Sequence, residues 1–335
     1  MEEIIQKTPA DLEIEFYSKK YYLSYSALSK VMYSPSLFYR HYVLQQREER
    51  TESYLIDGKV IHCLLLDDGS FNKHFILMPA SLPGDSTRKI VDKIYDIVKE
   101  GPGLLENYDQ EILDVLKEIN LHQSLKTDKQ RIEKIVTEES KSYFEFLKIK
   151  GNKDLLDTET MQRCNEAVDA IKNNSVACNL LGLIKHEMEN IDIFNEIPLQ
   201  SDLVDAYPFG MKGIVDNIKV EYDTKTVHIN DLKTTGKTIV DFEDSIEYFN
   251  YWIQAAMYER LVREAFKDLL TQDWKIQFHF IVVDKYNQVY SFEISSATMM
   301  IWQERLETKL NEFKWHYTEK KYALPYLFAT SQIIL

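Results

Sequence analysis

The amino-acid sequence predicts an α/β (α+β) fold in which a mixed central β-sheet is flanked by helices. Three observations support this prediction. Helical periodicity dominates residues 87–190, and alternating segments rich in Ile and Val follow residue 190. The C-terminal segments have the order β-β-β-α-β-β-α. A sheet and amphipathic helices in this order bury their apolar faces against one another, which favours a layered α/β architecture.

Composition limits the class of protein. Apolar residues make up 44% of the 335 residues and aromatic residues 12%, more than an intrinsically disordered chain contains. No run approaches the roughly 18 apolar residues of a membrane span, and the acidic start, residues 1–16, is unlike a signal peptide. The cysteines are few and far apart, which favours the reducing cytoplasm and argues against a cysteine-built zinc or iron–sulfur site. They are Cys63, Cys164 and Cys178.

The charge balance argues against nucleic acid as a partner. The chain has 40 Lys and Arg against 54 Asp and Glu, so its formal net charge is −14. Nucleic-acid binders are commonly basic, because Lys and Arg displace the counterions of phosphates. From composition alone, DNA is therefore an unexpected ligand.

Residues 1–86 are expected to form N-terminal helices that contribute to the core. Pro35 interrupts an apolar run and divides it into two short helices, each preceded by serine. The expected elements are two helices in 24–44, with Ser24 or Ser26 and then Ser34 as N-caps, a buried helix in 51–68 and a strand in 71–79.

Residues 87–190 are expected to form a helical insertion or arm. Apolar residues recur there at helical spacing in at least three stripes, one of which follows an N-cap at Asp157. Residues 142–157 alternate briefly and are interpreted as a hairpin or an irregular arm.

Residues 191–335 are expected to form the core of the fold. Alternating apolar and polar residues predict strands, and longer stretches with helical spacing predict helices. The expected strands are 192–200, 212–222, 226–235, 275–285 and 288–295, and the expected helices are about 242–268 and 297–318.

Two aspartates are predicted to face each other across a hairpin. If Asp223 and Thr224 form the turn, antiparallel pairing places Asp216 opposite Asp231, with Cβ atoms roughly 4.5–5.5 Å apart. Lys233 lies two residues beyond Asp231 and shares its face, because strand side chains alternate.

Opposed like charges destabilise a sheet, and apolar neighbours make the repulsion stronger. A divalent cation with oxygen ligands between the carboxylates explains the pair, and an Asp–Lys salt bridge leaves the second aspartate unexplained. The alternative is a register shifted by a bulge, which makes both residues ordinary surface carboxylates.

Three further residues extend this candidate site. His62 follows Gly58 by one helical turn in an apolar helix; its alternative is a hydrogen-bonded core histidine. Gln254 and Tyr258 are i and i+4 neighbours on one face of the helix that follows the strand of Asp231 and Lys233. Their alternative is the polar stripe of an amphipathic helix.

Several short motifs, in this order, resemble the PD-(D/E)XK nuclease superfamily, and more closely its RecB-like branch with the RecE-type phage exonucleases, the exodeoxyribonuclease eight group. Residues of the N-terminal part and of the middle extend the resemblance over about 20–320. The strongest motifs are G-K-V-I-H at 58–62, G-I-V-D at 213–216, D-L-K at 231–233 and Q-A-A-M-Y at 254–258, and the weaker ones are L-S-Y-S-A-L-S-K at 23–30, S-P-S-L-F at 34–38 and K-D-L-L-D at 153–157.

The resemblance implies a restriction-endonuclease-like PD-(D/E)XK core and a role for each motif residue. The second carboxylate is Asp rather than Glu, which the family permits, and the four-cysteine cluster of CRISPR-associated relatives is absent. The resemblance implies that Asp216, Asp231 and the Leu232 carbonyl are ligands of Mg²⁺, or of Mn²⁺ in its place, and that His62 contributes to the metal site. It implies that Lys233 orients or deprotonates the attacking water and that Glu196 orients the metal or the lysine. Gln254 and Tyr258 are implied to support the site and to contact the DNA backbone.

The implied function is a Mg²⁺-dependent DNA exonuclease that degrades linear double-stranded DNA in the 5′→3′ direction during phage-type recombination. Implied partners are DNA ends, a single-strand annealing protein and further copies of the chain in a homo-oligomer, with no membrane. The implied location is the cytoplasm of a bacterial host, with a phage or prophage origin. Two alternatives stay open: an endonuclease or single-strand nuclease of the same fold, and a catalytically inactive module that binds DNA or protein.

Overall fold

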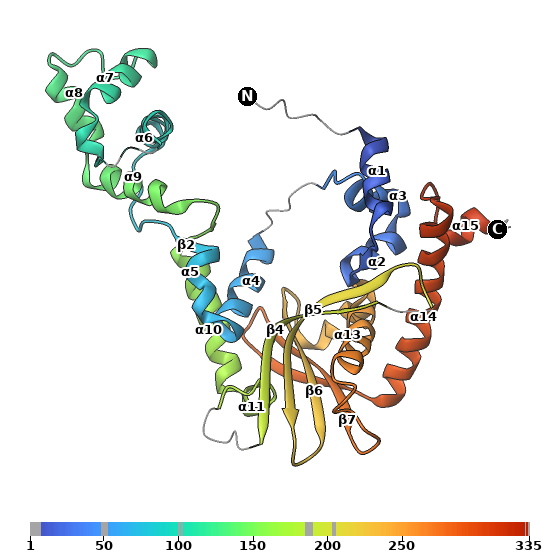
Figure 1. The fold of residues 1–335 in the computed structure, drawn as a ribbon. Helices are drawn as coiled ribbons and strands as arrows, with labels where there is room; N and C mark the ends of the chain where they lie inside the picture. Colours follow the sequence, from blue (N-terminus) through green and yellow to red (C-terminus); the bar gives the residue numbers. More distant parts are fainter. Residues whose placement is uncertain are drawn as a thin grey trace. The chain divides into compact units, whose positions relative to one another are not determined.

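The structure is a computed structural model that describes residues 8–47, 53–99, 101, 103–184, 190–202, 206–331 and 333. The chain divides into two compact units (Figure 1). The first, called the sheet unit, comprises Met1–Asp67 and Glu166–Leu335, and the second, the helical unit, comprises Asp68–Asn165. Within the described residues, no helix has both the length and the apolar character that a membrane span requires.

The sheet unit contains a six-stranded mixed sheet, which confirms the predicted fold class. β6 and β7 are parallel, as are β1 and β5, and the remaining pairs are antiparallel. From residue 191 onward the strands follow the predicted order, with two helices where one was predicted between the third and fourth strands and a short helix after the last long one. The strands are β1 (Tyr22–Leu23), β4 (Ile191–Ser201), β5 (Gly210–Glu221), β6 (Thr226–Thr235), β7 (Lys275–Asp284) and β8 (Val289–Ile294).

The strand β5 has different neighbours at its two ends. Asn217 pairs with β4 on one edge and with β6 on the other, and Met211 pairs with β4 and with β1. Since β4 occupies one edge along the whole strand, β1 and β6 share the opposite edge. Between them, no strand of the described residues pairs with residues 212–216 on that edge. This gap is where the candidate site lies.

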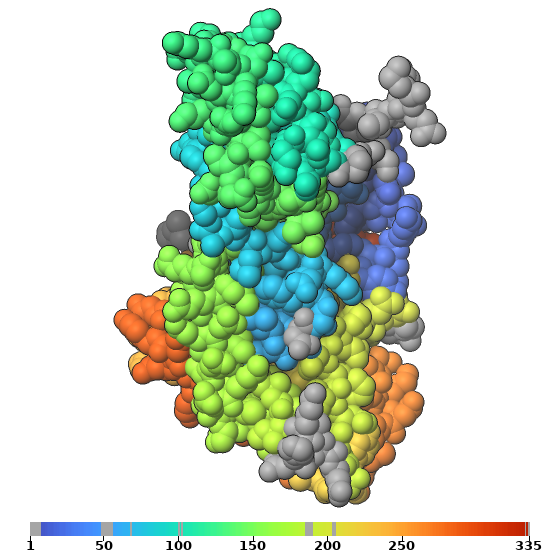
Figure 2. Space-filling model, turned by 90° about the vertical axis from the view of Figure 1, so that its left-hand side faces the viewer, coloured from blue at the N-terminus to red at the C-terminus, as the bar shows by residue number. Residues whose placement is uncertain are grey.

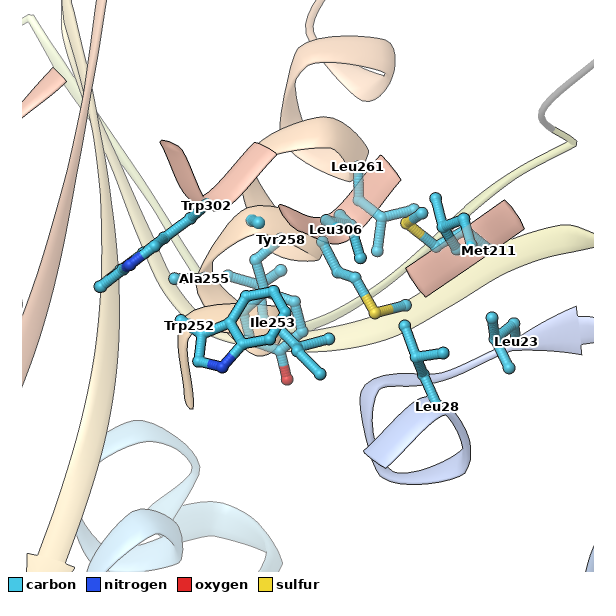
Figure 3. Packing of buried hydrophobic residues seen from close by; sticks show 14 of the residues in the cluster. Leu23, Leu28, Met211, Trp252, Ile253, Ala255, Tyr258, Leu261, Trp302 and Leu306 are labelled. Carbon is cyan, nitrogen blue, oxygen red and sulfur yellow. The ribbon is translucent and has the colours of Figure 1, made fainter. Parts of the chain in front are cut away.

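Helices cover the sheet, as amphipathic helices must if their apolar stripes are to be buried. Figure 3 shows α13 and α14 packed with β5 and α2 around Trp252, Leu306 and Met211, all buried in the main apolar cluster. On the other face α11 lies against the strands, and Figure 2 shows the outer surface of this segment in yellow-green. The helices of this unit are α1 (Pro9–Ser18), α2 (Tyr25–Tyr33), α3 (Pro35–Phe38), α4 (Ser53–Leu66), α11 (Ser175–Leu180), α12 (Phe242–Tyr248), α13 (Tyr251–Ala265), α14 (Ser296–Glu319) and α15 (Tyr326–Thr330), with a π-helix at Tyr39–Val43 and a 3₁₀ turn at Ile239–Asp241.

The helical unit has an apolar core of its own, which includes Ile94, Val115 and Phe144. It covers only part of the region expected at 87–190, since residues 166–184 belong to the sheet unit. Its elements are α5 (Phe71–His74), β2 (Phe75–Leu77), α6 (Asp85–Val98), α7 (Asp109–Glu118), α8 (Asp128–Ile135), α9 (Glu138–Lys150) and β3 (Asp154–Leu156), with 3₁₀ turns at Asp68–Ser70 and Leu105–Asn107, and α10 (Thr158–Asn173) crosses into the sheet unit.

The predicted caps are confirmed. Ser24 accepts a hydrogen bond from the backbone of Ala27, and Ser34 accepts one from Leu37. Asp157 accepts one from Thr160 at the start of α10. A Ser or Asp oxygen at these positions satisfies an amide that the first helical turn leaves without a partner.

Two predicted elements are wrong. The hairpin or arm expected at 142–157 is the end of α9 followed by β3, because Phe144 and Leu147 pack into the helical core and β3 pairs with the sequence-distant β2. The helix expected at 242–268 is two helices. Asn250 has a φ of 58°, and this left-handed residue ends α12 and caps α13.

Candidate metal centre and active site

The two predicted aspartates lie where β5 and β6 separate. Their ladder begins at Glu221 and Thr226 and follows the predicted register as far as Asn217 and Asn230. The next pair would be Asp216 and Asp231, and there the ladder ends. Instead of a backbone carbonyl, Asp216 Oδ2 accepts the amide of Leu232 at 2.8 Å. We call this region, Asp216 and Asp231 at the end of the ladder, the acidic fork.

His62 and Glu196 converge on Asp216. Ligand atoms of the three side chains all lie within 4.8 Å of one another. His62 Nδ1 is 3.4 Å from Glu196 Oε1 and 3.8 Å from Asp216 Oδ2. Asp216 comes from β5, Glu196 from β4 and His62 from α4. His62, four residues after Gly58 in α4, therefore lies beside the point where β5 and β6 separate.

Glu196 has an unusual backbone. Its φ is 47°, in the left-handed region that a residue with a Cβ rarely adopts. It lies between two paired positions, Asn195 opposite Asn217 and Ile197 opposite Val215, and is itself unpaired in the ladder. Such strain persists only where the surroundings enforce it, and it often accompanies functional sites. Here it coincides with a carboxylate directed at the candidate centre.

The hydrogen bonds of His62 fix how its ring is used. Nε2 lies 2.9 Å from the carbonyl oxygen of Leu232, which can only accept, so Nε2 donates. Nδ1 is then turned toward two carboxylates, and it needs either a proton or a cation there. Without metal a proton fills this need: burial lowers the pKa of His62, but Asp216 and Glu196 outweigh burial and raise it to about 9.

Asp231 and Lys233 form the second part of the site. Asp231 has no exposed surface and makes an ion pair with Lys233. Burial raises the pKa of Asp231, Asp216 adds to this effect, and Lys233 opposes it. Burial would lower the pKa of the Lys233 ammonium, but Asp231 and Asp216 overcome burial and raise it. The lysine is therefore charged and held beside the carboxylates.

Gln254 and Tyr258 lie buried on α13, and the Gln254 amide donates to the Tyr258 hydroxyl at 3.0 Å. Burial raises the pKa of Tyr258, and the negative charges of Asp216 and Asp231 raise it further. A Cβ on Gly213 would come within 2.7 Å of this ring, which explains glycine at that position.

A cavity of about 680 Å³ opens beside Tyr258. Its wall combines two segments that the sequence analysis singled out, the N-cap region of α2 and the start of β5. The lining residues are Ser24, Tyr25, Ser26, Pro198, Leu199, Gln200, Lys212, Gly213, Ile214 and Tyr258.

Two aromatic residues near Lys233 were not predicted from the sequence. The Lys233 ammonium lies 4.8 Å from the centre of the Tyr251 ring. The hydroxyl of Tyr25 donates to the backbone of Phe249, just before Tyr251. The only local signal is an aromatic residue three positions before Gln254, and the contact itself depends on the break between α12 and α13.

The donor set fits a hard divalent cation. Two carboxylates and an imidazole nitrogen face a common point, and oxygen-rich sets of this kind suit Mg²⁺ or Mn²⁺. The cluster differs from the predicted ligand set in three ways. It includes Glu196, and the Leu232 carbonyl accepts a hydrogen bond from His62. Asp231 lies outside the cluster, paired with Lys233.

Comparison with solved structures yields matches, one of which is described here. No protein-family model matches the chain, and no curated protein matches it. The crystal structure of a "Putative exonuclease" from Eubacterium rectale is similar over 99% of this chain and 96% of that one, at 12% sequence identity and a TM-score of 0.49. At this level of similarity, the residues of the site themselves carry the case for an activity.

Proposed function

We propose that this protein is a divalent-metal-dependent nuclease, a hydrolase of phosphodiester bonds with a PD-(D/E)XK-type site. The acidic fork is the observation that carries the proposal. The ladder of β5 and β6 ends just before two aspartates, of which Asp216 lies with His62 and Glu196 in one cluster and Asp231 forms an ion pair with Lys233. Buried like charges are retained where a cation compensates them.

In this proposal Asp216, Glu196 and His62 hold Mg²⁺ or Mn²⁺, and Asp231, opposite Asp216 in register, completes the ligand set. When bound, the metal supplies an acidified water and neutralises charge on the scissile phosphate. Asp216 Oδ2 is already oriented by the Leu232 amide at 2.8 Å, and the same oxygen faces His62 at 3.8 Å. The site is thus built before substrate arrives.

Lys233 supplies a fixed positive charge. Its ammonium is protonated beside two carboxylates, and a preorganised cation stabilises the charge that develops on a phosphate during hydrolysis. This favours an electrostatic and water-orienting role for Lys233 over that of a general base.

We propose linear double-stranded DNA as the substrate, degraded in the 5′→3′ direction during phage-type recombination. Support comes from the order of the sequence motifs, which resembles RecE-type exonucleases. Gln254 and Tyr258 then support the centre and contact the DNA backbone. With a net charge of −14, grip on DNA is expected to be weak and salt-sensitive, so the proposal includes a homo-oligomer that encloses DNA and an annealing protein that receives the single strand.

The test incubates the protein with linear and covalently closed circular duplex DNA, with Mg²⁺, with Mn²⁺ and with EDTA. Metal-dependent loss of linear DNA alone supports the proposal, and a label on either the 5′ or the 3′ end reports the direction. Cutting of circles would favour the endonuclease instead. A chain that degrades neither DNA would be the inactive binding module.

A further inference from the structure

Lys233 has two supports of different chemistry. Asp231 from its own strand β6 forms an ion pair with it, and the face of Tyr251 from α13 lies 4.8 Å from its ammonium. Only 13% of the lysine side chain is exposed. An aromatic face attracts an ammonium through its quadrupole, and the attraction is stronger where water is excluded.

The Tyr251 ring is itself held in place. It stacks on Phe249 with centroids 5.4 Å apart and on Phe242 at 6.1 Å, and it packs against Phe280 of β7 at 6.1 Å. These rings come from three elements or their junctions, so rotation of Tyr251 would disturb all of them. The ring is therefore a rigid surface rather than a mobile cover.

The backbone before Tyr251 is also fixed. Asn250 adopts the left-handed conformation that separates α12 from α13, and its carbonyl accepts the amide of Ile253 at 2.9 Å. From α2, the hydroxyl of Tyr25 donates to the Phe249 carbonyl at 2.5 Å. The N-terminal segment thus clamps the corner from which Tyr251 projects.

We propose that Tyr251 is a positioning residue for Lys233, and that Tyr25 keeps it in place by clamping the corner at Phe249. The inference rests on the proposed function, in which Lys233 acts at the scissile phosphate. In the proposed function, Asp231 would be shared between the lysine and a metal ion, so its attraction for the ammonium would be weaker. The face of the Tyr251 ring is not a metal ligand, so it would continue to define the position of the lysine.

The main experiment compares Tyr251→Phe, which keeps the aromatic face, with Tyr251→Leu, which removes it. We expect Tyr251→Leu to lower kcat for Mg²⁺-dependent DNA hydrolysis by about 10- to 100-fold with KM little changed, because a small displacement of a catalytic group has effects of this size. Tyr251→Phe should stay within about threefold of wild type, since the ring face is retained. Tyr25→Phe, which only loosens the corner, should give a smaller loss than Tyr251→Leu.

A spectroscopic measurement makes the test independent of activity. In metal-free protein with ¹³C-labelled lysine, the ε-methylene protons of Lys233 should be shifted upfield by the ring current of Tyr251. Loss of the signal in Lys233→Arg assigns it. The shift should persist in Tyr251→Phe and disappear in Tyr251→Leu.

A matched control is available in the turn between β7 and β8. There Lys285 lies 5.0 Å from the ring of Tyr286, which is 64% exposed. Tyr286→Leu removes a lysine–aromatic contact of similar geometry and should leave kcat unchanged. Thermal unfolding of each variant identifies any loss of activity caused by unfolding.

Wild-type kcat in Tyr251→Leu would overturn the proposal, as would equal losses in the Leu and Phe variants or an unshifted lysine signal in wild type. If wild type shows no metal-dependent hydrolysis while the lysine signal behaves as expected, the proposed function fails and the placement of Lys233 by Tyr251 stands.

Discussion

Strands β5 and β6 carry two adjacent polar pairs with opposite properties. Asn217 and Asn230 form the last pair of the ladder, and Asp216 and Asp231 occupy the next position, where the ladder ends. All four side chains are buried. One position along the same two strands therefore separates a neutral buried pair from a charged one.

The neutral pair belongs to a row of three amides, Asn195, Asn217 and Asn230, here called the amide row. Asn230 donates to Asn217, and Asn217 donates to Asn195, each at 2.7 Å. The same two donors also reach the carbonyls of Leu181 and Leu180 at the end of α11. The amide row thus ties three strands to one helix by neutral hydrogen bonds.

The difference between the amide row and the acidic fork indicates which buried polar residues stabilise the fold and which indicate a function. In the amide row, every donated bond ends on a neutral acceptor of the fold, so the residues contribute to stability. At the acidic fork, Asp216 lies with Glu196 and His62, and Asp231 forms an ion pair with Lys233, so carboxylates outnumber cationic side chains there. Unequal charge, rather than burial, distinguishes the candidate site from the amide row.

The largest expected effect separates the two regions by activity. Asp216→Asn keeps the shape of the side chain and can still accept the Leu232 amide, but it removes a charge from the metal ligands. We expect metal-dependent DNA hydrolysis to fall on the order of 1000-fold or more, and the thermal unfolding midpoint to stay equal or rise. Gel-based hydrolysis assays and calorimetric metal titration measure both changes.

Asp192→Asn is the matched control, because Asp192 is an exposed aspartate of β4 that accepts the Tyr222 hydroxyl. It should hydrolyse DNA at the wild-type rate. An active Asp216→Asn variant would contradict both the comparison and the proposed nuclease.

The next effect is a pH dependence of the free energy of unfolding. His279, beside the amide row, and His62, at the acidic fork, are expected to contribute to it with opposite signs. Next to the amide row, burial and then His228 lower the pKa of His279 to about 4, so below its unfolded value of about 6.5 the unfolded chain binds more protons. Stability from His279 is complete above pH 6.5 and lost as the pH falls toward 4, by about 3 kcal/mol. His62, raised to about 9, contributes stability below pH 6.5 that is lost as the pH rises through 9.

Urea unfolding in EDTA from pH 4.5 to 9.5 measures both limbs. His279→Phe should flatten the acid limb, and His62→Gln should flatten the alkaline limb. If His279→Phe keeps the wild-type pH dependence of stability in acid, His279 is not the cause of the acid limb. If His62→Gln keeps it in alkali, His62 is not the cause of the alkaline limb.

The sequence allowed the hairpin register to be predicted because the turn and the alternation of β5 and β6 are local. The same logic identified the caps at Ser24 and Ser34. The predicted register is confirmed as far as Asn217 and Asn230, and Asp216 and Asp231 lie at the next position, beyond the last pair. The sequence did not show that the ladder ends one position before the two aspartates, because the end of a strand pair depends on contacts with the rest of the fold.

The remaining features arise from contacts between distant segments. β2 and β3 pair in parallel although about 80 residues separate them, so local alternation suggested a hairpin instead. The break at Asn250 carries neither glycine nor proline, and a single left-handed residue leaves almost no sequence signal. The approach of Tyr251 to Lys233 follows from that break and was equally hidden.

A smaller effect tests the amide row. Asn230→Ala removes donors to Asn217 and to Leu180 and leaves those acceptors buried without a partner. We expect a loss of about 2 kcal/mol in the free energy of unfolding, with DNA hydrolysis by the folded protein unchanged. Urea unfolding gives the first quantity, and the second is the hydrolysis rate at 10 °C.

Asn311→Ala serves as the control, since this exposed amide donates to the Glu307 carbonyl one turn earlier in α14 and its loss should change stability by less than about 0.5 kcal/mol. A loss of hydrolysis in folded Asn230→Ala would show that the two regions are coupled rather than separate.

The smallest expected effect concerns how α4 reaches the acidic fork. A Cβ at Gly58 would lie 3.3 Å from the Thr234 hydroxyl, so alanine pushes the helix slightly away from β6. Alanine also favours the helix by about 1 kcal/mol, so the net change in stability should be under about 1 kcal/mol. Because His62 follows one turn later, we expect Mn²⁺ affinity to fall by about threefold in calorimetric titration. Unchanged affinity would mean that the position of α4 does not control the metal centre, and that His62 reaches Asp216 by side-chain freedom alone.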